Sequence, residues 1–372
     1  MTERVAEAGD ADQQTPVLAP DSHRSSTILS VQIARFVAAF AVTLFHSHGA
    51  ILLQFGISSE EAAAGLWKIG ASGVHIFFVI SGFVMVLTSY RDGQPILPQT
   101  FLKRRFLRIY PIYWVLAFVY LTAHVAMGTP YSLSGGEVAR ALALYSTDAS
   151  LIIGPGWTLA YEVYFYLCFA ICLLFGMTRG LVILTGFFVA SAAAGMAFPA
   201  AKAFHLATNG LLLEFILGCW AGYAYLNRRE LFGWVGWPGL VIGTVLLIAS
   251  AWLPEKVPAV AAWGVPSLLI VAGAISLERH LRGPIARAFA LLGDSSYFLY
   301  LSHILLLDVF ILIFAPQVGM SVGAVTAMAV AFAVGCVVIS HAGHLLIEAP
   351  MLRVLNRLLK RRRQPAASLR SA

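Results

Sequence analysis

Residues 31–48 read VQIARFVAAFAVTLFHSH, an apolar run interrupted by Arg35, His46 and His48. Similar runs recur along nearly the whole chain of 372 residues, of which 59% are hydrophobic and 12% are charged. A soluble globular chain is about a quarter charged, so this composition excludes that class. Runs of about 20 apolar residues suit membrane-spanning helices, and the alternating pattern of a β-barrel is absent. We therefore predict an all-α, polytopic integral membrane protein.

Ten apolar segments are predicted to be transmembrane helices. They cover residues 28–50, 70–90, 109–127, 157–176, 180–198, 208–227, 236–253, 259–277, 294–315 and 321–347. The stretch 137–153 is short and polar for a span, and either lies at the interface or re-enters the bilayer.

Three regions follow from this pattern. Residues 1–27 are polar, acidic and rich in Pro and Ala, which predicts a disordered cytosolic tail. Residues 28–355 form the predicted transmembrane domain. Residues 356–372 form a basic cytosolic tail, which we expect to bind lipid headgroups rather than nucleic acid because it flanks a membrane span.

Lysine and arginine residues predict the orientation. Of the 25 such residues, 20 fall in segments that lie on one side if ten spans start from a cytosolic N-terminus, and four fall on the other side. The remaining one, Arg35, lies within the first span. Cytosolic loops of membrane proteins carry this excess, so both termini are predicted to be cytosolic.

Ionisable residues inside membrane spans are functional candidates because their desolvation is costly. Arg35 and His46 are eleven residues apart, which puts both on one face of a helix, about 16 Å apart along its axis. A snorkelling arginine plus a histidine bonded to a neighbouring helix would also explain this pair. His341 and His344 have metal-like spacing but lack a third ligand, so no metal site is predicted.

Two further features stand near membrane spans. Arg105 and Arg108 share a helical face at the cytosolic entrance of an aromatic-rich span. They suit either a positive-inside anchor or a phosphorylated ligand. Glu162 lies inside the fourth span and needs a positively charged or hydrogen-bonding partner, whereas Glu214 is interpreted as structural.

Six motifs occur in a fixed order along the chain. They are Arg35 with His46, GVHIFFVISGF (73–83), Arg105 and Arg108 before Tyr110-Pro111, WTLAYEVYFYL (157–167) with Glu162, SYFLYLSH (296–303) and Glu348-Ala349-Pro350. Together they make the chain resemble the membrane acyltransferase family 3, over about residues 28–355, and its exopolysaccharide O-acetyltransferase branch in particular. One position departs from the family: His75 stands where its motif has Asp, so no role of that carboxylate is carried over.

The resemblance implies transfer of an acyl group, usually acetyl, from cytosolic acyl-CoA to a hydroxyl of a cell-surface or secreted glycan. A lipid-linked saccharide is a further acceptor class. It also implies a multi-pass protein of the inner (cytoplasmic) membrane, in contact with membrane lipids and with polysaccharide biosynthesis machinery. No metal is expected, and acetyl-CoA is the expected donor.

The resemblance also implies roles for individual residues. His46 would be the general base or the acyl carrier, and Glu162 would orient its imidazole. Arg35, Arg105 and Arg108 would bind the CoA moiety. Substrate binding or structural support would fall to Trp157, Tyr297, His303 and Glu348.

A proton-coupled secondary transporter or flippase for a polysaccharide precursor is the alternative, because carriers also bury charges among many spans. No inverted repeat is seen, and the basic entrance suits CoA better than a small ion-coupled solute. A scaffold of a polysaccharide export complex would leave the intramembrane ionisable residues unexplained.

Overall fold

A computed structural model describes residues 28–57, 65–91, 94–198, 205–254, 256–314 and 320–361. The predicted tail 1–27 and residues 362–372 of the other tail lie outside the described residues. Within the described ranges the fold is helical, and the strands are β1 (Tyr90–Arg91) and β2 (Gln94–Pro95), an antiparallel pair. The all-α prediction is therefore confirmed.

The helices follow the apolar segments closely. The N-terminal half contains α1 (Leu29–Gln54), η1 (Gly65–Ser72), α3 (Gly73–Ser89), α4 (Pro98–Ala126), α5 (Gly135–Ala143), η2 (Thr147–Leu151), η3 (Gly154–Gly156), α6 (Trp157–Cys172), η4 (Leu173–Phe175) and α7 (Met177–Ala197). The C-terminal half contains α8 (His205–Thr208), α9 (Leu212–Asn227), α10 (Glu230–Ala249), η6 (Ser250–Trp252), η7 (Val260–Gly264), α11 (Val265–Ser276), η8 (Glu278–His280), α12 (Pro284–Asp294), α13 (Ser296–Ile313), α14 (Val322–Gly343), η9 (His344–Glu348) and α15 (Ala349–Arg361).

Among the described residues, eight helices are long and apolar enough to cross a membrane. The chain is thus a multi-pass membrane protein. Two predicted segments, 208–227 and 259–277, coincide with the shorter α9 and with η7 plus α11. The number of ten spans therefore stays a prediction.

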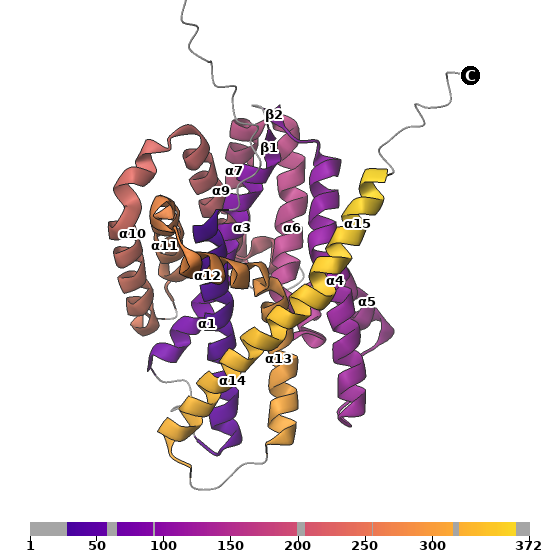
Figure 1. The fold of residues 1–372 in the computed structure, drawn as a ribbon. Coiled ribbons are helices and arrows are strands. Elements are labelled where there is room, and N and C mark those ends of the chain that lie inside the picture. Colours follow the sequence, from indigo (N-terminus) through magenta and orange to yellow (C-terminus); the bar gives the residue numbers. More distant parts are fainter. Residues whose placement is uncertain are drawn as a thin grey trace, which may run out of the picture.

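Helices α3 and α9 pack through glycine. A Cβ atom at Gly82 of α3 would collide with the carbonyl oxygen of Phe215, and one at Gly218 of α9 would collide with that of Val79. Without a hydrophobic driving force in lipid, such close backbone approach is a main source of helix association. The two helices thereby form a rigid pair, beside the α10–α11 pair at one edge of the bundle (Figure 1).

Helix α1 packs against α3, α12, α13 and α14. Its N-terminus is capped by a residue distant in sequence, since the Glu278 carboxylate accepts hydrogen bonds from the backbone N–H groups of Leu29 (2.8 Å) and Ser30 (2.7 Å). These N–H groups have no partner within the helix, and a negative charge there also complements the helix dipole. The cap fixes the end of α1 that carries Arg35.

The segment 137–153 forms α5 and η2 and lies alongside α4 (Figure 1). Three ring donors of α4 satisfy the carbonyl groups at the end of α5: Tyr110 bonds Ala143, Tyr113 bonds Ala141 and Trp114 bonds Leu142, each at 2.9 Å. The last carbonyl groups of a helix lack partners within it, and a bilayer offers no water to bond them. Whether this segment lies at the interface or re-enters the bilayer stays a prediction.

The first described residues of α1 and the last of α15 lie toward the same end of the molecule (Figure 1). Helices α14, η9 and α15 form one continuous helical run, of which Val322–Leu358 is a candidate span. Helix α15 continues to Arg361, beyond the predicted domain boundary at residue 355. Which side of the membrane this end faces stays a prediction.

Candidate active site

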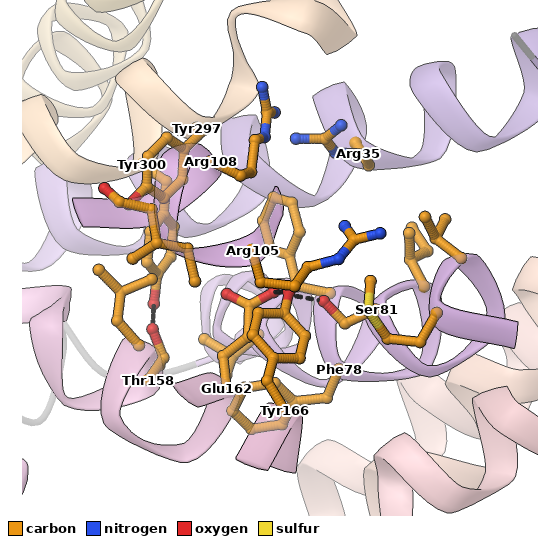
Figure 2. Close-up of a pocket in the computed structure, with 17 residues that line it drawn as sticks. Arg35, Phe78, Ser81, Arg105, Arg108, Thr158, Glu162, Tyr166, Tyr297 and Tyr300 are labelled. Atoms are coloured by element: carbon orange, nitrogen blue, oxygen red, sulfur yellow. Dashed lines mark hydrogen bonds between the residues drawn. The ribbon is translucent and has the colours of Figure 1, made fainter. Parts of the chain in front are cut away.

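Five helices, α1, α3, α4, α6 and α13, enclose a cavity that holds most of the predicted site residues. Arg35, Arg105 and Arg108 line it together with a single carboxylate, that of Glu162 (Figure 2). Phenylalanine and tyrosine rings form much of the remaining wall. Even with Glu348 paired to Arg108 from behind, three guanidinium groups against two carboxylates leave the cavity with an excess of positive charge, which suits an anionic ligand.

Arg108 is held by a buried carboxylate. Its Nη1 lies 3.5 Å from Oε1 of Glu348, which is fully buried, and Oε2 of Glu348 lies 2.8 Å from Nδ1 of His344. The guanidinium also stands over the ring of Tyr297, 5.7 Å from its centroid. The hydroxyl of Tyr297 donates to the carbonyl of Ile109. Arg108, Tyr297 and Glu348, predicted from three separate motifs, are therefore one cluster.

Arg105 has a free donor. Its Nη2 donates to Oγ1 of Thr88 at 2.6 Å, and its guanidinium lies over the rings of Phe101 and Tyr166. Its Nε is buried and has no hydrogen-bond partner among the described residues. A buried donor of this kind is costly unless a ligand satisfies it.

Arg35 is held by Gln32 of its own helix α1, which is bonded in turn to Asp294 of the neighbouring helix α12. Nη1 of Arg35 donates to Oε1 of Gln32 at 3.2 Å, and Nε2 of Gln32 donates to Oδ1 of Asp294 at 2.5 Å. Asp294 ends α12, which packs against α1. The chain of contacts keeps the guanidinium at the cavity.

Glu162 is bonded by two hydroxyl groups. Ser81 on α3 donates to its Oε1 at 2.6 Å, and Tyr166, one turn further along α6, donates to the same oxygen (Figure 2). Neither hydroxyl group was predicted from the sequence as a partner of Glu162. The four-residue spacing between Glu162 and Tyr166 on one helix was the available signal.

His46 lies outside the set of residues that line this cavity. Its Nδ1 is 3.1 Å from Nε2 of His303 on α13, and His303 is buried. The ring of Tyr300 lies between the two regions: it lines the cavity, packs against Phe77 and lies 6.1 Å from the His303 ring. The expected contact of Glu162 with the imidazole of His46 is therefore not seen, because its carboxylate is bonded to Ser81 and Tyr166.

Two other predicted positions have separate surroundings. Trp157, the first residue of α6, packs edge-on against Tyr161 and does not line the cavity. His48 is buried, stacks on Trp67 with 4.0 Å between ring centroids, and lies 3.4 Å from the hydroxyl of Thr326. It faces away from the His46–His303 pair, as its position two residues along predicts.

Comparisons with known proteins agree with the motifs. A family model described as an acyltransferase domain, acyltransferase family 3, matches residues 28–341. The exopolysaccharide production protein ExoZ of Rhizobium meliloti (strain 1021) is 30% identical over 314 residues, which cover 79% of this chain and 93% of that protein. The acyltransferase MdmB of Streptomyces mycarofaciens is 27% identical over 378 residues, covering 90% of this chain and 92% of that protein. No solved structure is significantly similar.

The chain belongs to acyltransferase family 3. This chain has His75 where the family motif has Asp, and the structure shows what this histidine contacts. Nδ1 of His75 lies 2.7 Å and 2.9 Å from the two carboxylate oxygens of Glu214 on α9, and Trp263 stacks on the His75 ring. Glu214 is fully buried. The pair joins α3 to α9 away from the arginine cavity, which fits the structural role predicted for Glu214.

Proposed function

We propose that this acyltransferase moves an acetyl group from cytosolic acyl-CoA to a hydroxyl of a glycan, with His46 as the general base or the acyl carrier. The observation that carries the proposal is the gathering of Arg35, Arg105 and Arg108 in one cavity, beside the His46–His303 pair. A transporter of a neutral precursor would have no need for three guanidinium groups facing one carboxylate.

The arginines bind the phosphate groups of CoA. Guanidinium pairs with phosphate through two parallel hydrogen bonds, and Nε of Arg105 is a donor that lacks a partner among the described residues. Arg108 is balanced by Glu348, which keeps its charge tolerable while the site is empty. Arg35 contributes from α1, so donor binding also touches the helix that carries His46.

His46 carries out the chemistry. As a general base, its ring nitrogen takes the proton of the acceptor hydroxyl while the oxygen attacks the thioester carbonyl carbon. The carbon–sulfur bond then breaks, and the CoA thiolate receives the proton from the imidazolium. As an acyl carrier, the same nitrogen attacks the thioester carbonyl carbon first, the carbon–sulfur bond breaks and the CoA thiolate leaves. In a second step the hydroxyl oxygen attacks the acyl carbon, the carbon–nitrogen bond breaks, and the hydroxyl proton is passed to the thiolate.

Glu162 belongs to the donor side of this machinery. Its carboxylate fixes the hydroxyl groups of Ser81 and Tyr166, and the Tyr166 ring lies under the guanidinium of Arg105. We propose that Glu162 holds Tyr166 in place, that the Tyr166 ring in turn positions the guanidinium of Arg105 for the donor, and that Glu162 does not orient His46.

A glycan acceptor is supported by the printed name of the relative ExoZ, an exopolysaccharide production protein. We propose that the acceptor is a cell-surface, secreted or lipid-linked saccharide, and that the protein works in the inner membrane beside polysaccharide biosynthesis machinery. The cytosolic donor then reaches the arginine cavity from the side where the basic segments are predicted to lie.

The test is purified full-length protein in detergent with radiolabelled acetyl-CoA. We expect release of free CoA thiol, transfer of label to the saccharide fraction of membranes from the expressing cells, and loss of both in His46→Ala. Binding of acetyl-CoA without thiol release or label transfer would reject the acyltransferase activity. Uptake of a saccharide precursor into vesicles driven by a proton gradient would support the transporter instead.

A further inference from the structure

The hydrogen bonds of His303 identify which of its nitrogens carries a proton. The side chain is 1% exposed, and its Nδ1 lies 3.1 Å from the backbone carbonyl oxygen of Leu299. A carbonyl oxygen can only accept, so Nδ1 must carry hydrogen. None of the contacts recorded for the ring within the described ranges is a carboxylate, and an unpaired buried imidazolium would be costly. His303 is therefore neutral, and its Nε2 bears a lone pair.

The same reasoning extends to His46. Its Nδ1 lies 3.1 Å from Nε2 of His303, and that lone pair requires a donor. Nδ1 of His46 must then carry hydrogen, which in a neutral ring leaves the lone pair on Nε2. Within the described part of the chain, no residue hydrogen-bonds Nε2 of His46.

We propose that His303 is a positioning residue that holds His46 in the Nδ1–H tautomer, so that Nε2 of His46 is the reacting atom. This inference rests on the proposed function for its chemical meaning, but the tautomer itself does not. In a carboxylate–histidine dyad, the carboxylate accepts the Nδ1–H of the catalytic histidine and fixes its tautomer. Here the neutral imidazole of His303 takes the place of that carboxylate.

A neutral partner also stabilises the positive charge that forms on His46. When Nε2 of His46 takes the hydroxyl proton, the ring becomes an imidazolium whose Nδ1–H points at the lone pair of His303. Both protons stay on His46, because the buried ring of His303 has no carboxylate among its recorded contacts to offset a positive charge. The Nε2–H of His46 then protonates the leaving thiolate, so the proton balance closes.

The amides asparagine and glutamine form a matched pair of variants. In His303→Gln the side-chain oxygen reaches the position of Nε2 and can still accept from His46. In His303→Asn the amide reaches only the position of Nδ1, so the contact to Leu299 is kept and the contact to His46 is lost. We expect kcat for acetyl-CoA hydrolysis, measured as CoA thiol release, to stay within a few-fold for glutamine. For asparagine we expect it to fall about 10²-fold, with KM for acetyl-CoA unchanged.

A measurement without activity decides the tautomer. In full-length protein labelled with ¹⁵N-histidine, two-bond nitrogen–proton correlations show which ring nitrogen carries hydrogen, and the His46 signal is assigned by its loss in His46→Ala. We expect Nδ1–H in the unmodified protein and a mixture of tautomers in His303→Asn.

Two results would overturn the proposal: an Nε2–H tautomer of His46 in the unmodified protein, or an unchanged kcat in a His303→Asn variant whose acetyl-CoA affinity shows that it is folded. If asparagine at 303 prevents folding, the spectrum of the unmodified protein still decides. An Nδ1–H spectrum combined with no acetyl-CoA turnover would reject the proposed function while keeping the tautomer.

Discussion

Replacing Arg105 by alanine tests donor binding most cleanly among the three cavity arginines. Loss of Arg108 would leave the buried carboxylate of Glu348 with His344 as its described partner, so its effect on binding would be mixed with a loss of stability. The recorded hydrogen bond of Arg105 goes to the hydroxyl of Thr88, a neutral group. Its removal therefore breaks no direct ion pair with a fully buried carboxylate.

The magnitude follows from the donors that Arg105 can offer. A hydrogen bond to a charged group contributes about 1.5–3 kcal/mol, and each 1.4 kcal/mol is a factor of ten in Kd. Loss of one such bond to a CoA phosphate therefore predicts a Kd for acetyl-CoA about 10- to 150-fold higher. Isothermal titration of the detergent-solubilised protein measures this directly.

The matched control is Lys103→Ala, two residues earlier on the same helix. Its side chain is exposed and lies outside the cavity, yet its loss removes the same formal charge. An exposed charge contributes at most about 1 kcal/mol, so the control should weaken binding by less than about fivefold. Equal effects of the two variants, or an unchanged Kd in folded Arg105→Ala, would refute a phosphate contact and leave Arg105 as a topology anchor.

Three further outcomes are expected. His46→Ala should lower acetyl transfer by about 10²–10⁴-fold while keeping acetyl-CoA affinity, whereas His48→Ala should keep most activity; the opposite result would mean that the wrong histidine was chosen. Glu214→Leu should lower the free energy of unfolding, measured by thermal unfolding, by about 3–5 kcal/mol, and adding His75→Leu should restore much of it. If Glu214→Leu is as stable as the unmodified protein, His75 and Glu214 do not form a buried pair. A cysteine placed at Lys360 in a cysteine-free protein should resist impermeant thiol reagents in intact cells, and labelling from outside would invert the predicted topology.

The sequence singled out the three arginines of the cavity for two different reasons. Arg35 stands out because burying a charge within an apolar run is costly in a membrane. Arg105 and Arg108 belong to a basic segment that also suits a topology anchor, and only their shared helical face and the family motif indicated a ligand. The structure then brought all three into one space. Runs of apolar residues likewise located the eight long apolar helices of the described ranges, since each needs its own run.

The partners of these residues could not be predicted in the same way. Pairing His46 with His303, or Glu162 with Ser81, depends on how far one helix slides along another, and a shift of one turn changes every contact. Between α3 and α9, for example, the close approach of Gly82 to Phe215 accompanies one particular register, and no local sequence pattern reveals which residues will meet in this way. The count of spans is equally ambiguous for α9, because it is short for a bilayer and is covered by α3.

The separation of Glu162 from His46 has a chemical reason. Three guanidinium groups are useful for holding phosphate, but a cation close to an imidazole disfavours its protonated form, which a general base must reach during the reaction. The ring of Tyr300 borders both the cationic cavity and His303, Phe77 packs against it, and the Tyr300 hydroxyl is bonded to Thr158 at 3.0 Å. A carboxylate therefore belongs with the arginines, whose charge it offsets, while a neutral histidine suffices to orient His46. Tyr300, which lines the cavity, and His303, which contacts His46, both lie on α13, so under the proposed function this helix would connect donor binding to the base.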